Sequence, residues 1–253
     1  MQDKSSIFVQ GLSKRYKGKN TPILDELDLK IAAGSLYGLL APNGAGKTTT
    51  IEILCGLKKF DSGKVMVGGL SVPSELPEIK KIIGLVPQDI ALFPMLTGRE
   101  NLNIIGGIYG VEKKLLKERV EELLNRFGLE NSADRSINQY SGGMKRRINL
   151  IAGLLHVPKI LILDEPTVGV DAQSRNLILE ELIKLNRNGT TVLFISHYLE
   201  EAECICDTVG LMDGGKIVLE GNPQELCKLN PECKNLEALY FKLSGKQMRD
   251  TYE

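Results

Sequence analysis

The most restrictive feature of this sequence is the glycine-rich segment Ala41–Thr49, which reads APNGAGKTT. It follows an apolar run, Ser35–Leu40, that predicts a buried strand, and it opens an apolar helix predicted over about Lys47–Leu57. A loop between a strand and a helix aims successive backbone N–H groups at one point, together with the partial positive charge of the helix N-terminus. Gly44 and Gly46 let the backbone approach a ligand closely. The segment therefore predicts a phosphate-binding loop.

Within this loop, Lys47 is expected to reach the β- and γ-phosphates of a nucleotide, and Thr48 to place its hydroxyl on Mg²⁺. The pattern usually opens with glycine, but here it opens with Ala41. Alanine is harmless if this position needs a negative φ, whereas a positive φ would strain the loop by about 1 kcal/mol or more. The residues predicted to contact the phosphates are Ala41, Pro42, Asn43, Gly44, Ala45, Gly46, Lys47, Thr48 and Thr49.

The remaining sequence alternates short apolar strands with helices, which predicts an α/β fold whose parallel sheet is covered on both faces. The first third is β-rich, the middle is helical, and a hairpin is predicted around Gly214 and Gly215. Beyond about Gly221 the sequence predicts a polar tail with one apolar helix, Leu236–Leu243.

Composition limits the class of protein. The 253 residues include 32 Lys and Arg against 32 Asp and Glu, so no net charge favours nucleic acid or an anionic membrane. No uninterrupted apolar run reaches the roughly 18 residues of a membrane span, and the N-terminus lacks a signal-peptide pattern. Five cysteines, an odd number, indicate no disulfide framework and suit a reducing compartment.

A second motif, ILILDEP, spans Ile160–Pro166 and ends an apolar strand with two adjacent carboxylates. Ligands of parallel α/β sheets bind at the carboxyl ends of the strands, which is where Asp164 lies. Asp164 is expected to hold Mg²⁺ through water, and Glu165 to polarise the attacking water as general base. Taken alone, such a pair is also compatible with a strand that simply ends at a polar turn.

A third motif, YSGGMKRR, spans Tyr140–Arg147 and opens a helix with Ser141 and two glycines. This is again an anion-binding geometry, although an ordinary helix N-cap would look the same. A second phosphate-type site without its own Lys-Thr pair is unexpected, unless it acts on a nucleotide held elsewhere.

In their order and spacing, the phosphate loop, YSGGMKRR and ILILDEP resemble the nucleotide-binding domain of the ABC family, from about Ile7 to about Gln224. The resemblance implies a P-loop NTPase (RecA-like) core, an N-terminal antiparallel β subdomain and an inserted α-helical subdomain at about residues 89–158. It assigns residues 1–224 to the ABC ATPase domain and leaves 225–253 as a short C-terminal tail.

The resemblance also implies roles for single residues. Gln88, in LVPQD, matches the glutamine that touches Mg²⁺ and the attacking water, and His197 matches the histidine that contacts the γ-phosphate. Tyr16 matches the aromatic residue that stacks on adenine, and Asp171 matches the loop that crosses the dimer interface. Tyr140 stands where the family usually has leucine, which is expected to alter packing more than chemistry. The catalytic set implied is Glu165, His197, Lys47 and Gln88, the metal set is Thr48, Gln88 and Asp164, and the nucleotide-binding set adds Ser141, Gly142 and Gly143.

The function implied is an ATP-hydrolysing subunit of an ABC transporter, with ATP and Mg²⁺ as cofactors. Two such subunits, as a homodimer or heterodimer, would share each ATP between one phosphate loop and the partner's Ser141–Gly143. A separate membrane-spanning permease would dock near Gln88, against a groove lined by Leu96–Leu102, and the chain would lie in the cytoplasm at the inner face of the membrane. The segments ENLNIIGGIYG and LEALYFKLSGK resemble those of bacterial drug and polysaccharide exporters, which favours export.

Two other functions remain open at this stage. A soluble ABC-type ATPase acting on nucleic acid or ribosomes usually fuses two cassettes or carries a long coiled-coil insert, and this chain has neither; no direct contact with nucleic acid is expected. A generic P-loop kinase or GTPase is disfavoured by YSGGMKRR and by the lack of a guanine-reading motif.

Overall fold

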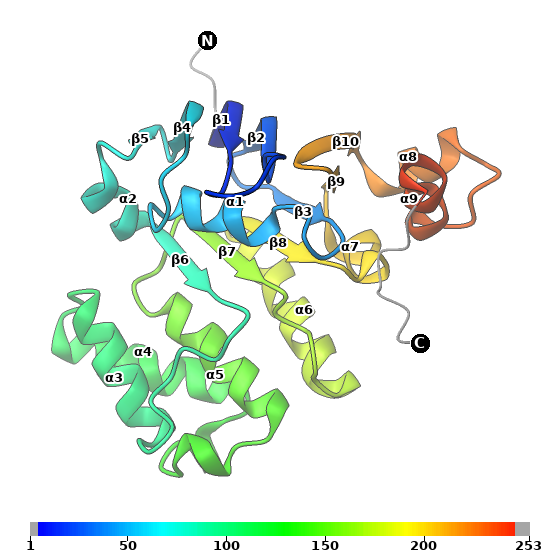
Figure 1. The fold of residues 1–253 in the computed structure, drawn as a ribbon. Helices are drawn as coiled ribbons and strands as arrows, with labels where there is room; N and C mark the ends of the chain where they lie inside the picture. Colours follow the sequence, from blue (N-terminus) through cyan, green and yellow to red (C-terminus); the bar gives the residue numbers. More distant parts are fainter. Residues whose placement is uncertain (1–4, 246–253) are drawn as a thin grey trace.

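The computed structural model describes residues 5–245. The first four residues of the predicted domain and the last eight of the predicted tail lie outside this range. Two β-sheets and a set of helices make up the described chain, and helices α3, α4 and α5 gather below the sheets (Figure 1).

The first sheet is antiparallel, with strand order β2-β1-β4-β5. Leu27, Leu29 and Ile31 alternate with exposed polar residues along β2, which is the period of a strand with one buried face. The members are β1 (Ser5–Lys14), β2 (Leu24–Ala32), β4 (Ser62–Val67) and β5 (Leu70–Val72).

The second sheet has the order β10-β9-β3-β8-β7-β6, in which only β10 is antiparallel to its neighbour. The four strands β3, β8, β7 and β6 lie side by side and parallel, so all their carboxyl ends meet at one edge. The members are β3 (Leu36–Leu40), β6 (Ile83–Val86), β7 (Ile160–Asp164), β8 (Thr191–Ser196), β9 (Thr208–Asp213) and β10 (Lys216–Gly221).

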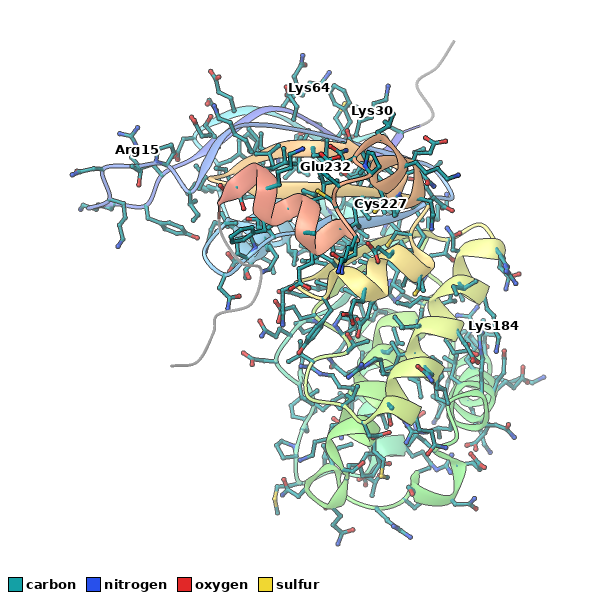
Figure 2. All side chains as sticks on the ribbon, turned by 90° about the vertical axis from the view of Figure 1, so that its right-hand side faces the viewer. Arg15, Lys30, Lys64, Lys184, Cys227 and Glu232 are labelled. Atoms are coloured by element: carbon teal, nitrogen blue, oxygen red, sulfur yellow. The ribbon has the colours of Figure 1, made fainter. Side chains whose placement is uncertain are left out.

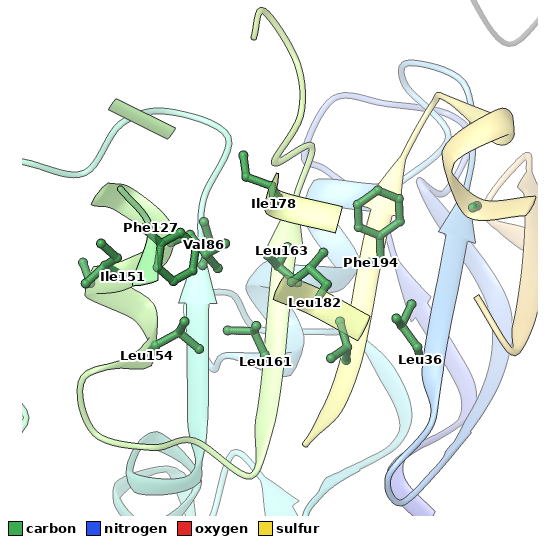
Figure 3. Close-up of a cluster of buried hydrophobic side chains, with 14 of the residues drawn as sticks. Leu36, Val86, Phe127, Ile151, Leu154, Leu161, Leu163, Ile178, Leu182 and Phe194 are labelled. Atoms are coloured by element: carbon green, nitrogen blue, oxygen red, sulfur yellow. The ribbon is translucent and has the colours of Figure 1, made fainter. Parts of the chain in front are cut away.

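Alternate residues of this parallel sheet enter two separate cores. On β8, Phe194 faces the core shared with the helical part, whereas Ile195 faces the core shared with the antiparallel sheet. Figure 3 shows Phe194 and Leu163 on the helical side, with Phe127 packed among Ile151 and Val86. The all-apolar strands are therefore buried on both faces, as a parallel sheet requires.

The helices are α1 (Lys47–Leu54), α2 (Leu76–Ile82), α3 (Gly98–Ile108), α4 (Lys113–Arg126), α5 (Gly142–Leu154), α6 (Ala172–Arg187), α7 (Leu199–Ile205), α8 (Pro223–Leu229) and α9 (Leu236–Ser244), with 3₁₀ turns at Glu130–Ser132 and Ile137–Gln139. Helix α3 begins at a capping box in which Thr97 accepts from the Glu100 amide and the Glu100 carboxylate accepts from the Thr97 amide.

The region beyond Gly221 contains two helices, where the sequence predicted one. Leu226 on α8 and Leu236, Leu239 and Tyr240 on α9 all belong to the core that contains α7. Figure 2 shows α9 on the near side at the level of the sheets, with the label of Cys227 beside it. Among residues 5–245, no helix is both long and apolar enough to cross a lipid bilayer.

Candidate nucleotide site

The predicted site residues follow four neighbouring parallel strands. The phosphate loop follows β3, His197 follows β8, Glu165 follows β7, and Gln88 comes two residues after β6. Because the carboxyl ends of parallel strands share one edge, residues from four distant parts of the sequence meet there.

The phosphate loop turns into α1 at Gly46, which has a φ of 107°. A Cβ atom at this position would lie 2.6 Å from a methyl group of Leu24 and 2.9 Å from the carbonyl oxygen of Ile23, so only glycine fits. Ala41 is fully buried and does not have a positive φ, so alanine replaces the usual glycine without backbone strain.

Lys47 is buried at the start of α1 and lies against the other end of its own loop. Its Nζ donates to the carbonyl oxygens of Ala41 at 2.6 Å and Pro42 at 3.2 Å. The same Nζ lies 3.6 Å from Oε1 of Glu165, which joins the loop to the end of β7.

Besides Lys47, the side chains of His197 and Gln88 contact the Glu165 carboxylate. His197 Nδ1 lies 3.0 Å from Oε1, and Gln88 Nε2 donates to Oε2 at 3.2 Å. Because an ionised carboxylate can only accept, this contact places a proton on His197 Nδ1. Glu165 also has a φ of 50°, a left-handed conformation that is costly for a residue with a side chain and is found mainly at functional sites.

The two adjacent carboxylates have opposite pKa shifts. The pKa of Asp164 is raised to about 6, mainly by burial and secondly by the charge of Glu165. Burial would also raise the pKa of Glu165, but the hydrogen bond and charge of His197 together with the charge of Lys47 bring that pKa below its usual value. At neutral pH Glu165 is therefore ionised and able to accept a proton from water, and Asp164 carries a charge that its surroundings compensate poorly.

The raised pKa of Asp164 predicts a pH-dependent gain in stability for Asp164→Asn. The folded-state pKa, about 6, exceeds the unfolded value near 3.9, so the stability linked to this proton is complete below about pH 4 and lost as the pH rises through 6. Without nucleotide and with EDTA present, the variant should raise the free energy of unfolding by about 2 kcal/mol at pH 8. Urea denaturation at pH 8 and pH 4 checks this, and an equal difference at both pH values would contradict it.

The loop, Gln88 and Glu165 line one cavity of about 180 Å³. This is smaller than the roughly 300–1,000 Å³ of a complete small-molecule site. The side chain of Tyr16 lines the same cavity, donating to or accepting from Thr49 through its hydroxyl group at 3.0 Å. Lys58 Nζ lies 4.9 Å from the centre of the Tyr16 ring and donates to its hydroxyl at 2.8 Å. The lining residues are Tyr16, Ile23, Asn43, Gly44, Gly46, Lys47, Thr48, Thr49, Gln88 and Glu165.

The residues of YSGGMKRR form a second group, which does not line that cavity. Ser141 is the exposed N-cap of α5, where its side chain accepts from the amide of Met144. Gly143 is buried against the start of α6, and a Cβ atom there would lie 2.3 Å from Ser174 Oγ and 2.8 Å from Asp171 Oδ2. Asp171 in turn caps α6 by accepting from the amide and hydroxyl of Ser174. Ser141–Gly143 and Asp171 therefore lie next to each other, and none of them lines the cavity of the phosphate loop.

Two residues without a predicted role, Arg146 and Asn149, contact the loop that contains Gln88. Arg146 lies within the YSGGMKRR motif and Asn149 lies two residues after it, but an arginine or an asparagine at these positions does not by itself predict such contacts. Tyr140, at the variant first position of the motif, is buried and donates to the carbonyl oxygen of Ser132 at 2.7 Å.

The residues present also fit the predicted Mg²⁺. Thr48 is an exposed residue that lines the cavity, and Asp164 is a buried carboxylate whose raised pKa marks a charge that a cation would compensate. With the Gln88 amide oxygen, these are the hard oxygen donors that Mg²⁺ prefers.

Comparison with known proteins agrees with this geometry. The family model described as ABC transporter matches residues 24–168. The linearmycin resistance ATP-binding protein of Bacillus subtilis is 47% identical over 86% of this chain and 70% of its own length. The Nod factor export ATP-binding protein I of Cupriavidus metallidurans is 40% identical over 90% of this chain and 75% of its own length.

Solved structures agree as well. An ATP-binding subunit of an ABC transporter superposes with a TM-score of 0.85 and 25% identity, covering 95% of this chain and all of that one. A dimeric ATP-binding cassette in a post-hydrolysis state with ADP and phosphate gives a TM-score of 0.77 and 27% identity, covering 85% of this chain and 97% of that one. The predicted P-loop NTPase fold is therefore confirmed. With its family model matched over more than half its length, this chain belongs to the ABC transporter family, as one of the family's ATP-binding ATPase subunits.

Proposed function

We propose that this chain powers an exporter by hydrolysing ATP at sites shared between two subunits, with the transport path on a membrane-spanning partner. The observation that carries the proposal is the division of the site. One chain holds a small, incomplete cavity around Lys47 and Glu165, and a separate anion-binding helix start at Ser141. A second subunit facing the first head to tail would place each helix start over the other subunit's cavity.

The geometry supports a mechanism in which this chain positions ATP and activates water. Lys47 and the loop amides hold the β- and γ-phosphates, and Glu165, ionised at neutral pH, accepts a proton from the attacking water. Gln88 and His197 fix the two oxygens of that carboxylate, and His197 stabilises charge at the γ-phosphate. Bound Mg²⁺, held by Thr48 and by Asp164 through water with Gln88 beside it, would neutralise the charge of the transferred phosphoryl group.

The proposed direction of transport rests on the relatives. Those most similar in sequence include proteins named for linearmycin resistance, daunorubicin resistance and Nod factor export. One of these names states export and the other two state resistance to a drug, and removal of the drug from the cell is one way to give resistance, which is why we propose export. For the same function the chain is proposed to lie at the inner face of the membrane, where it reaches both ATP and the permease.

The permease is proposed to dock on the helical part, about residues 89–158, of an ATPase domain that spans residues 1–224 and is followed by a short C-terminal tail, residues 225–253. The segment predicted to line the groove, Leu96–Leu102, is mostly turned into the helical part, and Glu100 alone of its residues is exposed. The loop just before it presents Phe93 and Met95, whose side chains are 51% and 80% exposed. Two large exposed apolar side chains between Gln88 and α3 support a protein contact at that point.

Affinity capture of the tagged chain from detergent-solubilised cells of its own host, with mass spectrometry to find a multi-spanning membrane protein, tests the proposal. The wild-type chain should be captured with that protein from detergent extracts, and Met95→Asp should lose at least about tenfold in captured protein, because a charge enters an apolar contact. Leu229→Asp is the matched control, since Leu229 is 77% exposed on α8, on the other side of the molecule (Figure 1). Capture of nucleic acid in place of a membrane protein would contradict the transport proposal.

A further inference from the structure

A buried carboxylate, Glu201 on α7, joins the segments that carry Glu165 and His197. Glu201 lies four residues after His197 and is 7% exposed. Its Oε2 accepts from the hydroxyl of Thr167 at 2.6 Å, and Thr167, two residues after Glu165, is 1% exposed. Neither Glu201 nor Thr167 lines the nucleotide cavity. The bond therefore ties the loop after β7 to the helix after β8 without touching the cavity itself.

The other oxygen of the Glu201 carboxylate faces a different element. Its Oε1 lies 3.4 Å from Nε of Arg175, a partly exposed residue in the first turn of α6. The loop from Pro166 to Asp171 connects Glu165 with α6, so one carboxylate contacts the chain near the start of this loop and just past its end. A buried ion pair adds little net stability, because both charges lose their hydration. The contacts of Glu201 are therefore better explained by the positions that they fix.

The residue that needs such fixing is Glu165. Its φ of 50° is costly, and a backbone of this kind persists only where surrounding contacts hold it. On one side, the amide of Glu165 donates to the carbonyl oxygen of Ile195 at 2.9 Å, near the end of β8. On the other side, Thr167 is bonded to α7. Both ties lead to the same segment, residues 195–201, which places His197 Nδ1 at 3.0 Å from Glu165 Oε1.

We infer that Glu201 is a positioning residue, which holds the Glu165 carboxylate against His197 by fixing Thr167 on α7. This role rests on the proposed function, in which Glu165 accepts a proton from the attacking water. Loss of the tie lets the loop after β7 relax, so the carboxylate moves away from the place where water is activated. Binding of nucleotide by the phosphate loop is unaffected, because neither Glu201 nor Thr167 lines the cavity.

Thr167→Val removes the hydroxyl that Glu201 holds and keeps the shape of the side chain. We expect kcat for ATP hydrolysis to fall about tenfold, because small displacements of catalytic groups are costly. KM for ATP and the calorimetric affinity for ADP should stay within about twofold of wild type, since the phosphate loop is intact. Thr167→Ser, which retains the hydroxyl, should keep kcat within about twofold of wild type.

The pH profile of kcat distinguishes positioning from a general loss of stability. The charged groups that interact with the Glu165 carboxylate come from four elements and are Lys47 on α1, Arg146 on α5, Asp164 on β7 and His197 after β8. Burial raises the pKa of Glu165, but His197 and Lys47 bring that pKa below its usual value. A weaker contact with His197 leaves burial less opposed, so the pKa of Glu165 should rise in Thr167→Val. Because the base acts only when ionised, kcat should then fall further at about pH 6 than at about pH 8.

Thr191→Val is the matched control. Thr191 is also buried, at the first residue of β8, where its hydroxyl accepts from the amide of Gly34 at 2.9 Å and lies 2.8 Å from the hydroxyl of Ser6. It lies at the opposite end of the strand from His197. Loss of its hydroxyl should lower thermal stability and leave kcat and its pH profile as in the wild type.

Glu201→Asp is the second variant, used where Thr167→Val does not fold. It keeps the charge but withdraws it from Thr167, so it should show the same loss of kcat and the same pH dependence. Wild-type kcat in the folded variant, a loss that is equal at both pH values, a Thr167→Ser variant as slow as Thr167→Val, or the same changes in Thr191→Val would overturn the inference. Rapid hydrolysis by Glu165→Gln would instead overturn the proposed base, and this role of Glu201 with it.

Discussion

Glu165→Gln is expected to abolish steady-state ATP hydrolysis and to trap a long-lived ATP-bound dimer. Glutamine preserves the size of the side chain, and its one oxygen can still accept from His197 while its NH2 group faces Gln88, whose amide can turn its own oxygen to accept, so the site should stay assembled. It cannot take a proton from water, and loss of a general base costs roughly 10²–10⁴-fold in rate. Without hydrolysis, the γ-phosphate contacts that hold the two subunits together persist.

Phosphate release and light scattering after gel filtration, each with and without ATP, measure the two effects of Glu165→Gln. Glu181→Gln is the control, because Glu181 is another buried glutamate that pairs with Arg126 and Lys184, away from the phosphate loop. This control should cost stability and leave the turnover of folded protein within about twofold of wild type. Rapid hydrolysis by Glu165→Gln would exclude Glu165 as the base.

Lys47→Ala is expected to lower ATP affinity by about 10- to 100-fold and to leave no measurable turnover. A charge-assisted hydrogen bond is worth about 1.5–3 kcal/mol, and Lys47 is the one cation of the phosphate loop. The substitution also removes the ammonium 3.6 Å from Glu165, which leaves two neighbouring buried carboxylates with less positive charge nearby. The variant should therefore be less stable than the wild type.

Lys47→Ala combined with Glu165→Gln separates the effect on stability from the effect on binding. Neutralising Glu165 should restore most of the stability lost in Lys47→Ala, because the uncompensated charge is gone, but it cannot restore a phosphate contact. Urea denaturation and calorimetric titration with ATP make the comparison. Recovery of ATP affinity in the double variant would show that Lys47 acts on folding alone.

Much of the site could be predicted because its residues follow strand ends. An apolar strand followed by Asp164 and Glu165, or by His197, predicts side chains at the carboxyl edge of a parallel sheet wherever the strands fall in the sequence. The left-handed backbone of Glu165 could not be predicted, since neither glutamate nor the proline after it favours that conformation. The surrounding fold imposes it.

The contacts of Arg146 and Asn149 depend on how α5 lies against the loop after β6, which no local pattern encodes. Helix α3 was a different case, since Thr97 and Glu100 have the spacing of a capping box that could have been recognised in the sequence. The second helix of the C-terminal region, α8, begins at Asn222 and Pro223, another readable start signal. The helical part predicted at about residues 89–158 includes α3, but its start at Thr97 was not identified, and α8 was missed because its seven residues are too few to show a helical period.

The crowding around Gly143 affects how a mutational scan of this protein must be interpreted. Any side chain there collides with Asp171 and Ser174 inside the same chain, so intolerance at that position reports on folding. Ser141 and Gly142 are exposed, and Ser141 has a single amide to cap. A scan that scored growth alone would not distinguish the three positions, although only substitutions at Ser141 and Gly142 can report on contacts with a ligand or with another subunit.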